Sequence, residues 1–385
     1  MKLLEGILVI DFSQFLSGPS ASLRLADLGA RVIKIEKPET GDICRHLYVS
    51  DVKIDDDSTI FHAINRNKES YAADLKNPED FEKVKKLLAK ADVVMHNFRP
   101  GVMERLGLDY KAVKRINPSA VYAEISGYGQ EGPWKDLPGQ DLLLQALTGI
   151  IHLSNDAHQP PTPMGVAVID ILAGTHLAQG ILAALFQRIG SNEGAFVQVS
   201  MLESAMDFQF EVFTCFLNDG YLLPKRSQSN HAHSYVGAPY GVYKTYDGYL
   251  ALAMGAIPFL GELLRCEPVK KYTDPSEWFI KRDEIKTAFA KHLATDTTAH
   301  WLSLLEPADI WCSEVLNYEQ LLDQEGYKAL DMELMVTTTS GTEVKTTRCP
   351  IRVDGELLKS SLGAPELGYH TQGIDHEFEI NNTPK

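Results

Sequence analysis

The sequence predicts an α/β fold, in which a large doubly wound unit is joined to a smaller α+β unit. Three observations predict it. The first half of the 385 residues alternates short apolar strands with helices, as a parallel sheet covered on both faces requires. Residues 224–233 (PKRSQSNHAH) are polar and rich in chain breakers, which we interpret as a linker. A hairpin pattern and amphipathic helices follow that linker.

The beginning of the chain reads as one parallel crossover unit. Pro19 suits the first turn of its helix, and Gly29 suits the end of that helix. The unit takes about 30 residues, as a right-handed crossover does. In order, we expect a strand at residues 6–12, a loop at 13–20, a helix at 21–28 and a strand at 31–36.

The alternation continues toward the middle of the chain. Asn77 predicts a helix start, because it can cap a helix that has Pro78 first and acids in its first turn. This helix should run to about residue 91. Ligands of such sheets bind at the carboxyl ends of the strands, so we expect the functional site there. Further strands are expected at residues 70–75, 92–98, 119–126 and 195–200.

The second half mixes helices and hairpins. Residues 165–190 predict one long, largely apolar helix, and 201–217 a second. Asp247-Gly248 predicts the turn of a hairpin. The remaining expected elements are two or three helices up to about residue 305, a strand at 310–315, a helix near 318–324, and a hairpin across 340–341.

Composition excludes several function classes. The chain has 52 Asp+Glu against 37 Lys+Arg, a formal net charge of −15. We therefore expect no nucleic acid and no membrane surface as a partner, because both are polyanionic. We find no apolar run of the roughly 18–20 residues that a membrane span needs. The five cysteines are scattered without a CxxC pair, which favours a reduced, cytoplasmic protein.

Basic residues gather near the expected carboxyl edge and are compatible with a phosphate-rich ligand, although composition alone favours a solvated surface. A dinucleotide site is not predicted. Glu36 ends the second strand as a ribose-binding acid would, but the loop before it holds one glycine, Gly18, where three are needed. The basic set comprises Lys34, Lys37, Arg66, Lys68, Arg99, Arg105 and Lys135.

Two carboxylates stand in otherwise apolar stretches. Asp141 follows a glycine-rich loop, residues 127–139, and Asp170 lies just inside the start of the long apolar helix. An ionised acid there is costly unless hydrogen bonds or the helix N-terminus stabilise it. Each is either a helix cap or a catalytic group, and a carboxylate can act as a covalent nucleophile. We find no GxSxG elbow, no HExxH and no other metal-ligand spacing, so no metal site is expected.

Several motifs, in order, closely resemble the class III CoA-transferases. This family includes the formyl-CoA:oxalate, carnitine and bile-acid CoA-transferases and the α-methylacyl-CoA racemases. The resemblance runs over nearly the whole chain. The motifs are residues 4–19 (LEGILVIDFSQFLSGP), 28–36 (LGARVIKIE), 67–76 (NKESYAADLK), 97–101 (NFRPG), 126–133 (SGYGQEGP), 138–149 (PGQDLLLQALTG), 349–355 (CPIRVDG) and 362–371 (LGAPELGYHT).

The resemblance implies an interlocked-ring homodimer. Each chain would form a Rossmann-like large domain from both of its ends, and a smaller α+β domain between them. The second subunit would thread through the ring. The implied division is a first part of the large CoA-binding domain at residues 1–200, a linker helix and loop at 201–228, a small domain at 229–325, and a return linker with the rest of the large domain at 326–385.

The resemblance also implies roles for individual residues. By position, Asp170 matches the family's nucleophilic aspartate, which forms anhydride and aspartyl-CoA thioester intermediates, and Asp141 matches a second acid that supports the site. Coenzyme A would be substrate and product, with no permanently bound cofactor. The partners would be an acyl-CoA donor and a small carboxylic acid. The implied coenzyme contacts are Phe15, Lys37, Ala73, Asn97, Phe98, Arg105 and Leu106.

Three departures from the family pattern narrow the activity. Gln140 stands where the racemases have a His, and Gln cannot titrate, so a two-base racemase is disfavoured. The racemases carry a Glu soon after a Gly-Ala-Ile segment. Here Gly255-Ala256-Ile257 runs directly into residues 258–260 (PFL), so that acid is absent. The glycine-rich flap of the oxalate-using members is absent as well. We expect a CoA-transferase, with an acyl-CoA racemase or a non-catalytic CoA-binding protein as alternatives.

The acceptor acid is not identified by the sequence. Four side chains after the linker are candidates for the acceptor pocket, but the polarity of a linker and a strand start explains them equally simply. These four are His231, His233, Tyr235 and Tyr240.

Overall fold

The computed structural model describes residues 2–47 and 52–380. The chain divides into two compact units. Unit 1 comprises Met1–Leu144, Ala167–Phe208 and Leu330–Lys385, and unit 2 comprises Gln145–Val166 and Gln209–Ala329. Residues 145–166 thus group with unit 2, whereas the implied division kept them in the large domain.

Unit 1 is built on a parallel six-stranded sheet of order β5-β2-β1-β6-β7-β8. The predicted α/β class and all six predicted strands are confirmed. Buried residues run almost without interruption along the inner strands, as expected for a sheet covered on both faces. The strands are β1 (Leu8–Asp11), β2 (Arg31–Glu36), β5 (Glu69–Ala72), β6 (Val93–His96), β7 (Val121–Ser126) and β8 (Phe196–Ser200).

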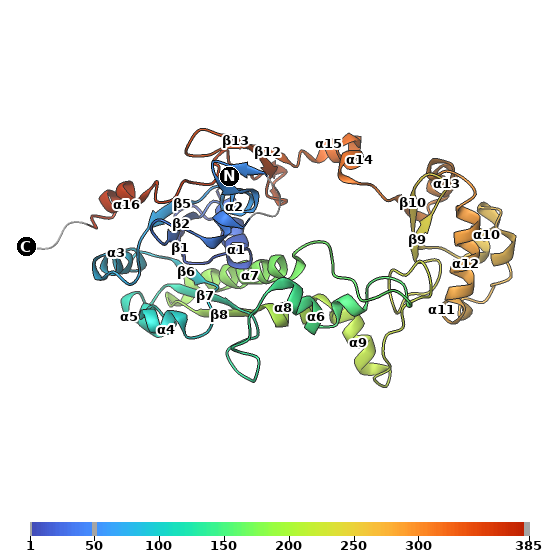
Figure 1. Cartoon of the computed structure of the whole chain (residues 1–385), viewed down its shortest axis with the longest axis horizontal. Helices are drawn as coiled ribbons and strands as arrows, with labels where there is room; N and C mark the ends of the chain where they lie inside the picture. Colours follow the sequence, from blue (N-terminus) through green and yellow to red (C-terminus); the bar gives the residue numbers. More distant parts are fainter. Residues whose placement is uncertain (1, 48–51, 381–385) are drawn as a thin grey trace, which may run out of the picture. The chain divides into compact units, whose positions relative to one another are not determined.

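Helices cover both faces of this sheet (Figure 1). Alternate strand side chains point to opposite faces, so Val9 packs toward α1 and α7 while Ile10 packs toward α3, α5 and α16. The helices of unit 1 are α1 (Ser17–Asp27), α2 (Thr59–Asn65), α3 (Pro78–Leu88), α4 (Val102–Leu106), α5 (Tyr110–Ile116), α7 (Val168–Ser191), α8 (Met201–Phe208) and α16 (Thr371–Glu377), with α6 (Asp141–Leu147) spanning the junction of the two units.

Helix α7 corrects one expectation about membranes. With 24 residues and a mean hydropathy of 1.6 over its most apolar window, it is long and apolar enough to cross a membrane by composition alone. No run of this kind was expected from the sequence. In the structure α7 packs against α1, β7, β8 and α8, and its Ile169, Leu177 and Ile181 are fully buried. It is therefore a core helix of unit 1.

Some predicted boundaries were wrong. The loop expected at 13–20 ends early, because α1 begins at Ser17 and takes Gly18 and Pro19 into its first turn. The single helix expected at 201–217 is two helices, α8 and α9 (Phe210–Asn218), separated at Gln209. Small elements were missed, namely β3 (Lys53–Ile54), β4 (Asp57–Ser58), β14 (Arg352–Val353), β15 (Glu356–Leu357), α2, α4, α5, α15 (Glu325–Leu330) and α16.

Unit 2 contains a three-stranded antiparallel sheet of order β11-β10-β9. The predicted hairpin around Asp247-Gly248 is confirmed as β9 (Gly241–Lys244) and β10 (Tyr249–Met254), and β11 (Trp311–Glu314) confirms the strand expected at 310–315. Tyr243 and Leu250 anchor a core shared with the neighbouring helices. These are α10 (Ile257–Leu263), α11 (Glu277–Ile280), α12 (Arg282–Leu293) and α13 (Thr298–Leu305), with α14 (Tyr318–Asp323) further along the chain.

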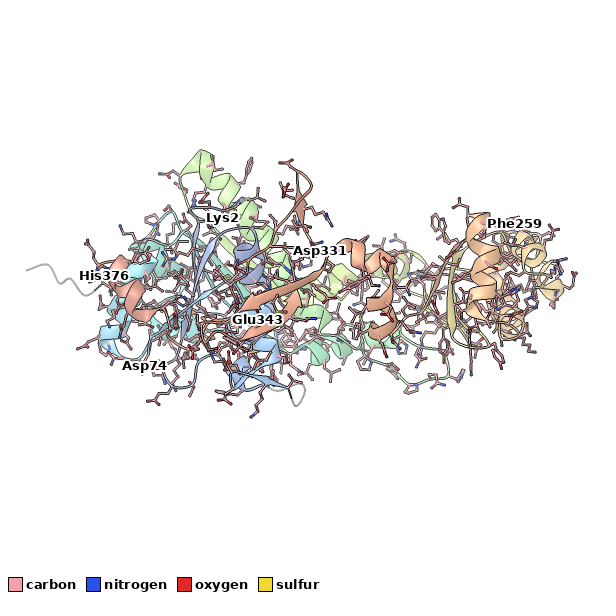
Figure 2. The ribbon with its side chains drawn as sticks, turned by 90° about the horizontal axis from the view of Figure 1, so that it is seen from above. Lys2, Asp74, Phe259, Asp331, Glu343 and His376 are labelled. Carbon is pink, nitrogen blue, oxygen red and sulfur yellow. The ribbon has the colours of Figure 1, made fainter. Side chains whose placement is uncertain are left out.

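The C-terminal part returns to unit 1. The predicted hairpin across residues 340–341 is confirmed as β12 (Glu333–Thr337) and β13 (Glu343–Thr347), and Figure 2 labels Glu343 at the start of β13. Beyond it, α16 packs against β5, where the Tyr71 hydroxyl donates to Asp375 at 2.6 Å. Unit 1 is thus completed by both ends of the chain.

Candidate active site

The carboxyl edge of the unit 1 sheet gathers most of the candidate residues. Phe15 follows β1, Lys37 follows β2, and Ala73 follows β5. Asn97 and Phe98 follow β6. Because these four strands are adjacent and parallel, the five residues lie along one edge of the sheet. The next helix, α4, carries Arg105 and Leu106.

Asp170 lies in the first turn of α7, the long core helix. Its neighbour Asp141 opens α6, and one Asp141 carboxylate oxygen accepts hydrogen bonds from the backbone N–H groups of Ile169 (2.8 Å) and Asp170 (3.1 Å). The residue before α7, Ala167, has no side chain that can cap it. Asp141 therefore supplies the N-terminal cap of α7 from another helix, and holds the Asp170 backbone in place.

A close contact of two glycines brings Asp141 to this position. A Cβ on Gly127 would lie 2.8 Å from the Cα of Gly139, so both residues must be glycine for the ends of the 127–139 loop to meet. The loop leaves the end of β7 and returns beside it, and α6 then starts at Asp141. The glycine-rich pattern seen in the sequence thus places the cap of α7.

Asp170 has an unusual ionisation for an aspartate. Burial and the nearby Asp141 carboxylate together raise its pKa to about 6, although a hydrogen bond from the Ser17 side chain lowers it. At neutral pH most of this carboxylate is still ionised, and its raised basicity makes it a better nucleophile than an ordinary aspartate. Such a shifted carboxylate is typical of a functional site.

Comparisons with known proteins show the family. A family model described as CoA-transferase family III matches residues 4–371. This chain belongs to CoA-transferase family III. The resemblance inferred from the motifs is confirmed.

Curated relatives cover almost the whole chain. It is 31% identical to the succinate–glutarate CoA-transferase of Agrobacterium fabrum, over 98% of this chain and 96% of that protein. It is 34% identical to the acetyl-CoA:oxalate CoA-transferase of Acetobacter aceti, over 97% and 95%. The crystal structure of a CAIB/BAIF family protein from Brucella suis superposes with a TM-score of 0.83, at 27% identity, over 97% of this chain and 99% of that one.

Only part of the basic set that could contact a phosphate-rich ligand is exposed in this member of CoA-transferase family III. Lys34 is fully buried and pairs with Asp42 at 2.8 Å, and Arg66 is buried against Asp27. Lys68 is buried too, and burial lowers its pKa to about 7. These three are corrections to the expected set, because buried, paired cations cannot reach a ligand phosphate. Those with exposed side chains are Lys37, Arg99, Arg105 and Lys135.

Sequence reasoning missed the buried polar residues beneath the site. The Asp42 carboxylate accepts from the backbone N–H of Phe15 at 3.2 Å, and Phe15 has a left-handed φ of 62°, which is unusual for a bulky residue. Lys34 donates to the Ser13 carbonyl at 2.6 Å. Together they fix the loop after β1. The only sequence signal was the presence of charged residues in and after a buried strand.

Gln140 lies just before α6 and is exposed. Its carbonyl accepts hydrogen bonds from the backbone N–H groups of Leu143 (3.0 Å) and Leu144 (3.1 Å), as the residue before a helix does. Its amide side chain cannot titrate, so the expectation that this chain lacks the racemases' proton-transferring His at this position stays a prediction.

The four acceptor-pocket candidates of unit 2 are engaged with their own surroundings. His231 accepts from the Ser227 backbone N–H at 3.0 Å and pairs with the Leu153 carbonyl at 3.0 Å, and burial lowers its pKa to about 4. His233 accepts from the backbone N–H of Tyr235 and packs edge-on to Tyr240. These contacts favour linker and strand-start polarity as the explanation.

Among residues 2–47 and 52–380, no three His, Cys, Asp or Glu side chains gather as a metal site requires.

Proposed function

We propose that this protein moves CoA from an acyl-CoA donor to a small carboxylic acid, with Asp170 as the covalent nucleophile. The proposal is supported by one observation above all, the half-buried Asp170 carboxylate with a raised pKa at the start of α7, in a chain of CoA-transferase family III. A carboxylate that is already ionised at neutral pH needs neither an activating base nor a metal.

The reaction balances in four steps. An Asp170 oxygen attacks the thioester carbonyl, the C–S bond breaks, and a mixed anhydride and CoA thiolate form. The thiolate attacks the Asp170 carbonyl, releasing the donor acid and leaving an aspartyl-CoA thioester. The acceptor carboxylate attacks that thioester and frees the thiolate again. The thiolate then attacks the acceptor carbonyl of the second anhydride, which yields the new acyl-CoA and restores the Asp170 carboxylate.

Asp141 and Gln140 have supporting roles in this proposal. Asp141 holds the first turn of α7 through two backbone N–H groups, so the Asp170 side chain starts from a fixed backbone. Gln140, which directly precedes Asp141, has an amide side chain that cannot titrate. Backbone N–H groups of the 127–139 loop would stabilise the oxyanion that develops on the thioester carbonyl.

The coenzyme would bind along the carboxyl edge of the sheet. Lys37 and Arg105 are exposed cations at this edge, and they would face the phosphates. The exposed ring of Phe15 would face the adenine or pantetheine portion. The other proposed contacts are Ala73, Asn97, Phe98 and Leu106.

We also propose an interlocked homodimer. Helix α9 of unit 2 has no buried residue, although it is strongly apolar. Its Phe210 is 68% exposed, and Leu222 and Leu223 just beyond it are 66% and 74% exposed. A second copy of this chain would cover such a surface, as the family's ring architecture implies.

Short dicarboxylic acids are the proposed acceptors. The relatives named above are a succinate–glutarate CoA-transferase and an acetyl-CoA:oxalate CoA-transferase, and the missing glycine-rich flap disfavours oxalate as the acceptor here. A panel of such acids, assayed with acetyl-CoA and succinyl-CoA as donors, would identify the pair.

The decisive experiment is to trap the enzyme after mixing with acyl-CoA. Hydroxylamine should convert Asp170 into a hydroxamate that mass spectrometry locates, and Asp170→Ala should abolish both the adduct and CoA transfer. Transfer at a near wild-type rate by Asp170→Ala would overturn the mechanism. Exchange of the α-proton with D₂O in the absence of any acceptor acid would instead establish the racemase, and binding of CoA without adduct or exchange would leave a non-catalytic protein.

A further inference from the structure

The loop after β1 is held by hydrogen bonds with one amide side chain, that of Asn97. The Asn97 carbonyl oxygen accepts from the backbone N–H of Gln14 at 2.8 Å, and its Nδ2 donates to the Gln14 carbonyl at 2.7 Å. The second Nδ2 hydrogen goes to the Ser17 hydroxyl at 3.2 Å. Both amide hydrogens of Asn97 are therefore used within the protein.

The direction of the Ser17 hydroxyl follows from this contact. Because Asn97 Nδ2 can only donate, Ser17 Oγ accepts from it, and the Ser17 hydrogen remains to be donated elsewhere. The Ser17 side chain lowers the pKa of Asp170 as a hydrogen-bond donor does, and a carboxylate can only accept. A one-way chain thus runs from Asn97 through Ser17 to Asp170. Ser17 is itself buried, with 4% of its surface exposed.

The packing of α1 on α7 makes this chain possible. Gly174 lies one helical turn after Asp170 on α7, and a Cβ there would lie 2.6 Å from the Ser17 carbonyl oxygen and 2.1 Å from Ser20 Oγ. Glycine at this position therefore lets the first turn of α1 reach Asp170. On the other side, a Cβ on Gly18 would collide with Ser13 and approach Asn97 Cγ to 3.2 Å. Gly174 thus leaves room for Ser17 beside Asp170, and Gly18 leaves room for the contact with Asn97.

We propose that Ser17, oriented by Asn97, is a positioning residue for Asp170 that fixes one carboxylate oxygen and leaves the other free to attack the thioester. This inference rests on the proposed role of Asp170 as nucleophile. A rigid carboxylate loses less freedom on reaching the attack geometry than a rotating one. Asn97 contributes through Ser17 and Gln14, because both of its amide hydrogens are used there, so its proposed contact with the coenzyme would not involve hydrogen-bond donation from this side chain.

The charged surroundings of Asp170 are simple in the described part of the chain. Asp141, from α6, is the charged group that acts on it. The titratable groups on the other elements packed against α7 are engaged elsewhere. They are Arg24 with Asp27 on α1, Glu124 with Gln130 and Gln198 at β7, Glu203 with Ser200, and Asp207 with His176 of α7 itself.

The test measures Asp170 acylation in single turnovers between pH 5 and 9. Wild-type acylation should rise with pH through about 6, where the carboxylate ionises. Removing a hydrogen bond to the charged form raises a carboxyl pKa. Ser17→Ala should therefore move this rise, the acid limb of the pH–rate profile, to higher pH by roughly one unit. It should also slow acylation on the plateau by about 10-fold or more, with KM for acyl-CoA nearly unchanged.

Three further variants sharpen the result. Ser17→Thr, which keeps the hydroxyl, should restore the wild-type limb. Ser20→Ala is the matched control, because Ser20 lies in the same turn of α1 and donates to the Ser17 carbonyl, and its limb should stay in place. Asn97→Ala should shift the limb in the same direction as Ser17→Ala, and combining the two should add little.

The possible results distinguish the positioning role of Ser17 from the proposed CoA transfer through Asp170. A wild-type enzyme that is never acylated on Asp170 overturns both. Acylation on Asp170 with an unmoved limb in a folded Ser17→Ala protein overturns the positioning role alone. A rise in KM for acyl-CoA with an unchanged limb would mean that Ser17 contacts the coenzyme instead, and would also overturn it.

Discussion

The burial of Asp170 has two consequences. Together with the Asp141 charge it raises the carboxyl pKa to about 6, and it makes the charged form costly to the fold. The folded pKa lies above the ordinary value of 3.8 for this group. Folding therefore favours the protonated form. The cost of burying the charged form lowers the free energy of unfolding in full above about pH 6, and this loss disappears as the pH falls below about 4.

Asp170→Asn should consequently stabilise the protein while abolishing its activity. The amide has nearly the same shape and carries no charge, so we expect a gain of about 1–3 kcal/mol in the free energy of unfolding at pH 8. At pH 4 the gain should vanish. Denaturant unfolding at the two pH values checks this, and equal gains at both would contradict the proposed burial cost. Glu193→Gln, an exposed acid just beyond the other end of α7, serves as control and should change neither stability nor activity.

Asp141 should show the opposite pH effect to Ser17. Its charge raises the pKa of Asp170, so Asp141→Asn should move the acid limb of the acylation rate to lower pH. The amide oxygen can still cap α7, and stability should change little. Asp141→Ala removes the cap and leaves two backbone N–H groups without their acceptor, at a cost of about 1–2 kcal/mol. A limb that moves upward in Asp141→Asn would show that its charge does not act on Asp170.

At the scale of the element, the contact of α1 with α7 depends on Gly174 against the ordinary preference of helices. Alanine is the better helix former by about 1 kcal/mol in a helix interior. Gly174→Ala should nevertheless destabilise the protein by roughly 2–3 kcal/mol and slow acylation, because its Cβ would overlap Ser20 Oγ and the Ser17 carbonyl. Gly190→Ala in the same helix meets nothing within 4 Å and should be neutral or stabilising. Thermal unfolding of the two variants gives the comparison, and a stabilising Gly174→Ala would refute the close approach.

Elements with a strong local signal were predictable from the sequence. The strand RVIKIE occupies Arg31–Glu36 as expected, and Asn77 caps the helix that begins with Pro78. The start of α1 was not predictable. Pro19 is compatible with a first helical turn, but no residue indicates that this turn already begins at Ser17 and includes Gly18, which has a low helix propensity. The break at Gln209 likewise has no breaker residue to announce it.

The site was predictable where chemistry and motif coincide. Asp170 and Asp141 stand out as acids in apolar stretches, and their roles remain predictions. Ser17 did not stand out, since its importance comes from contacts with residues 80 and 153 positions away. Buried cations such as Lys34 and exposed cations such as Lys37 look alike in the sequence. Only the fold, by pairing Lys34 with Asp42, distinguishes them.

At the scale of the whole molecule, the exposed apolar surface of unit 2 predicts self-association. Phe210, Phe213 and Leu217 of α9 are each at least 40% exposed, which is costly for an isolated chain in water. Sedimentation velocity should therefore find a dimer at micromolar concentration. Phe210→Asp should weaken it by placing a charge in the contact, whereas Tyr246→Asp, in the turn of the β9–β10 hairpin and 76% exposed, should leave it intact. Because the chains of an interlocked dimer cannot part without opening a ring, exchange between labelled and unlabelled dimers should be slower than unfolding of unit 2. A fully active monomer, or subunit exchange within seconds, would contradict the interlocked arrangement.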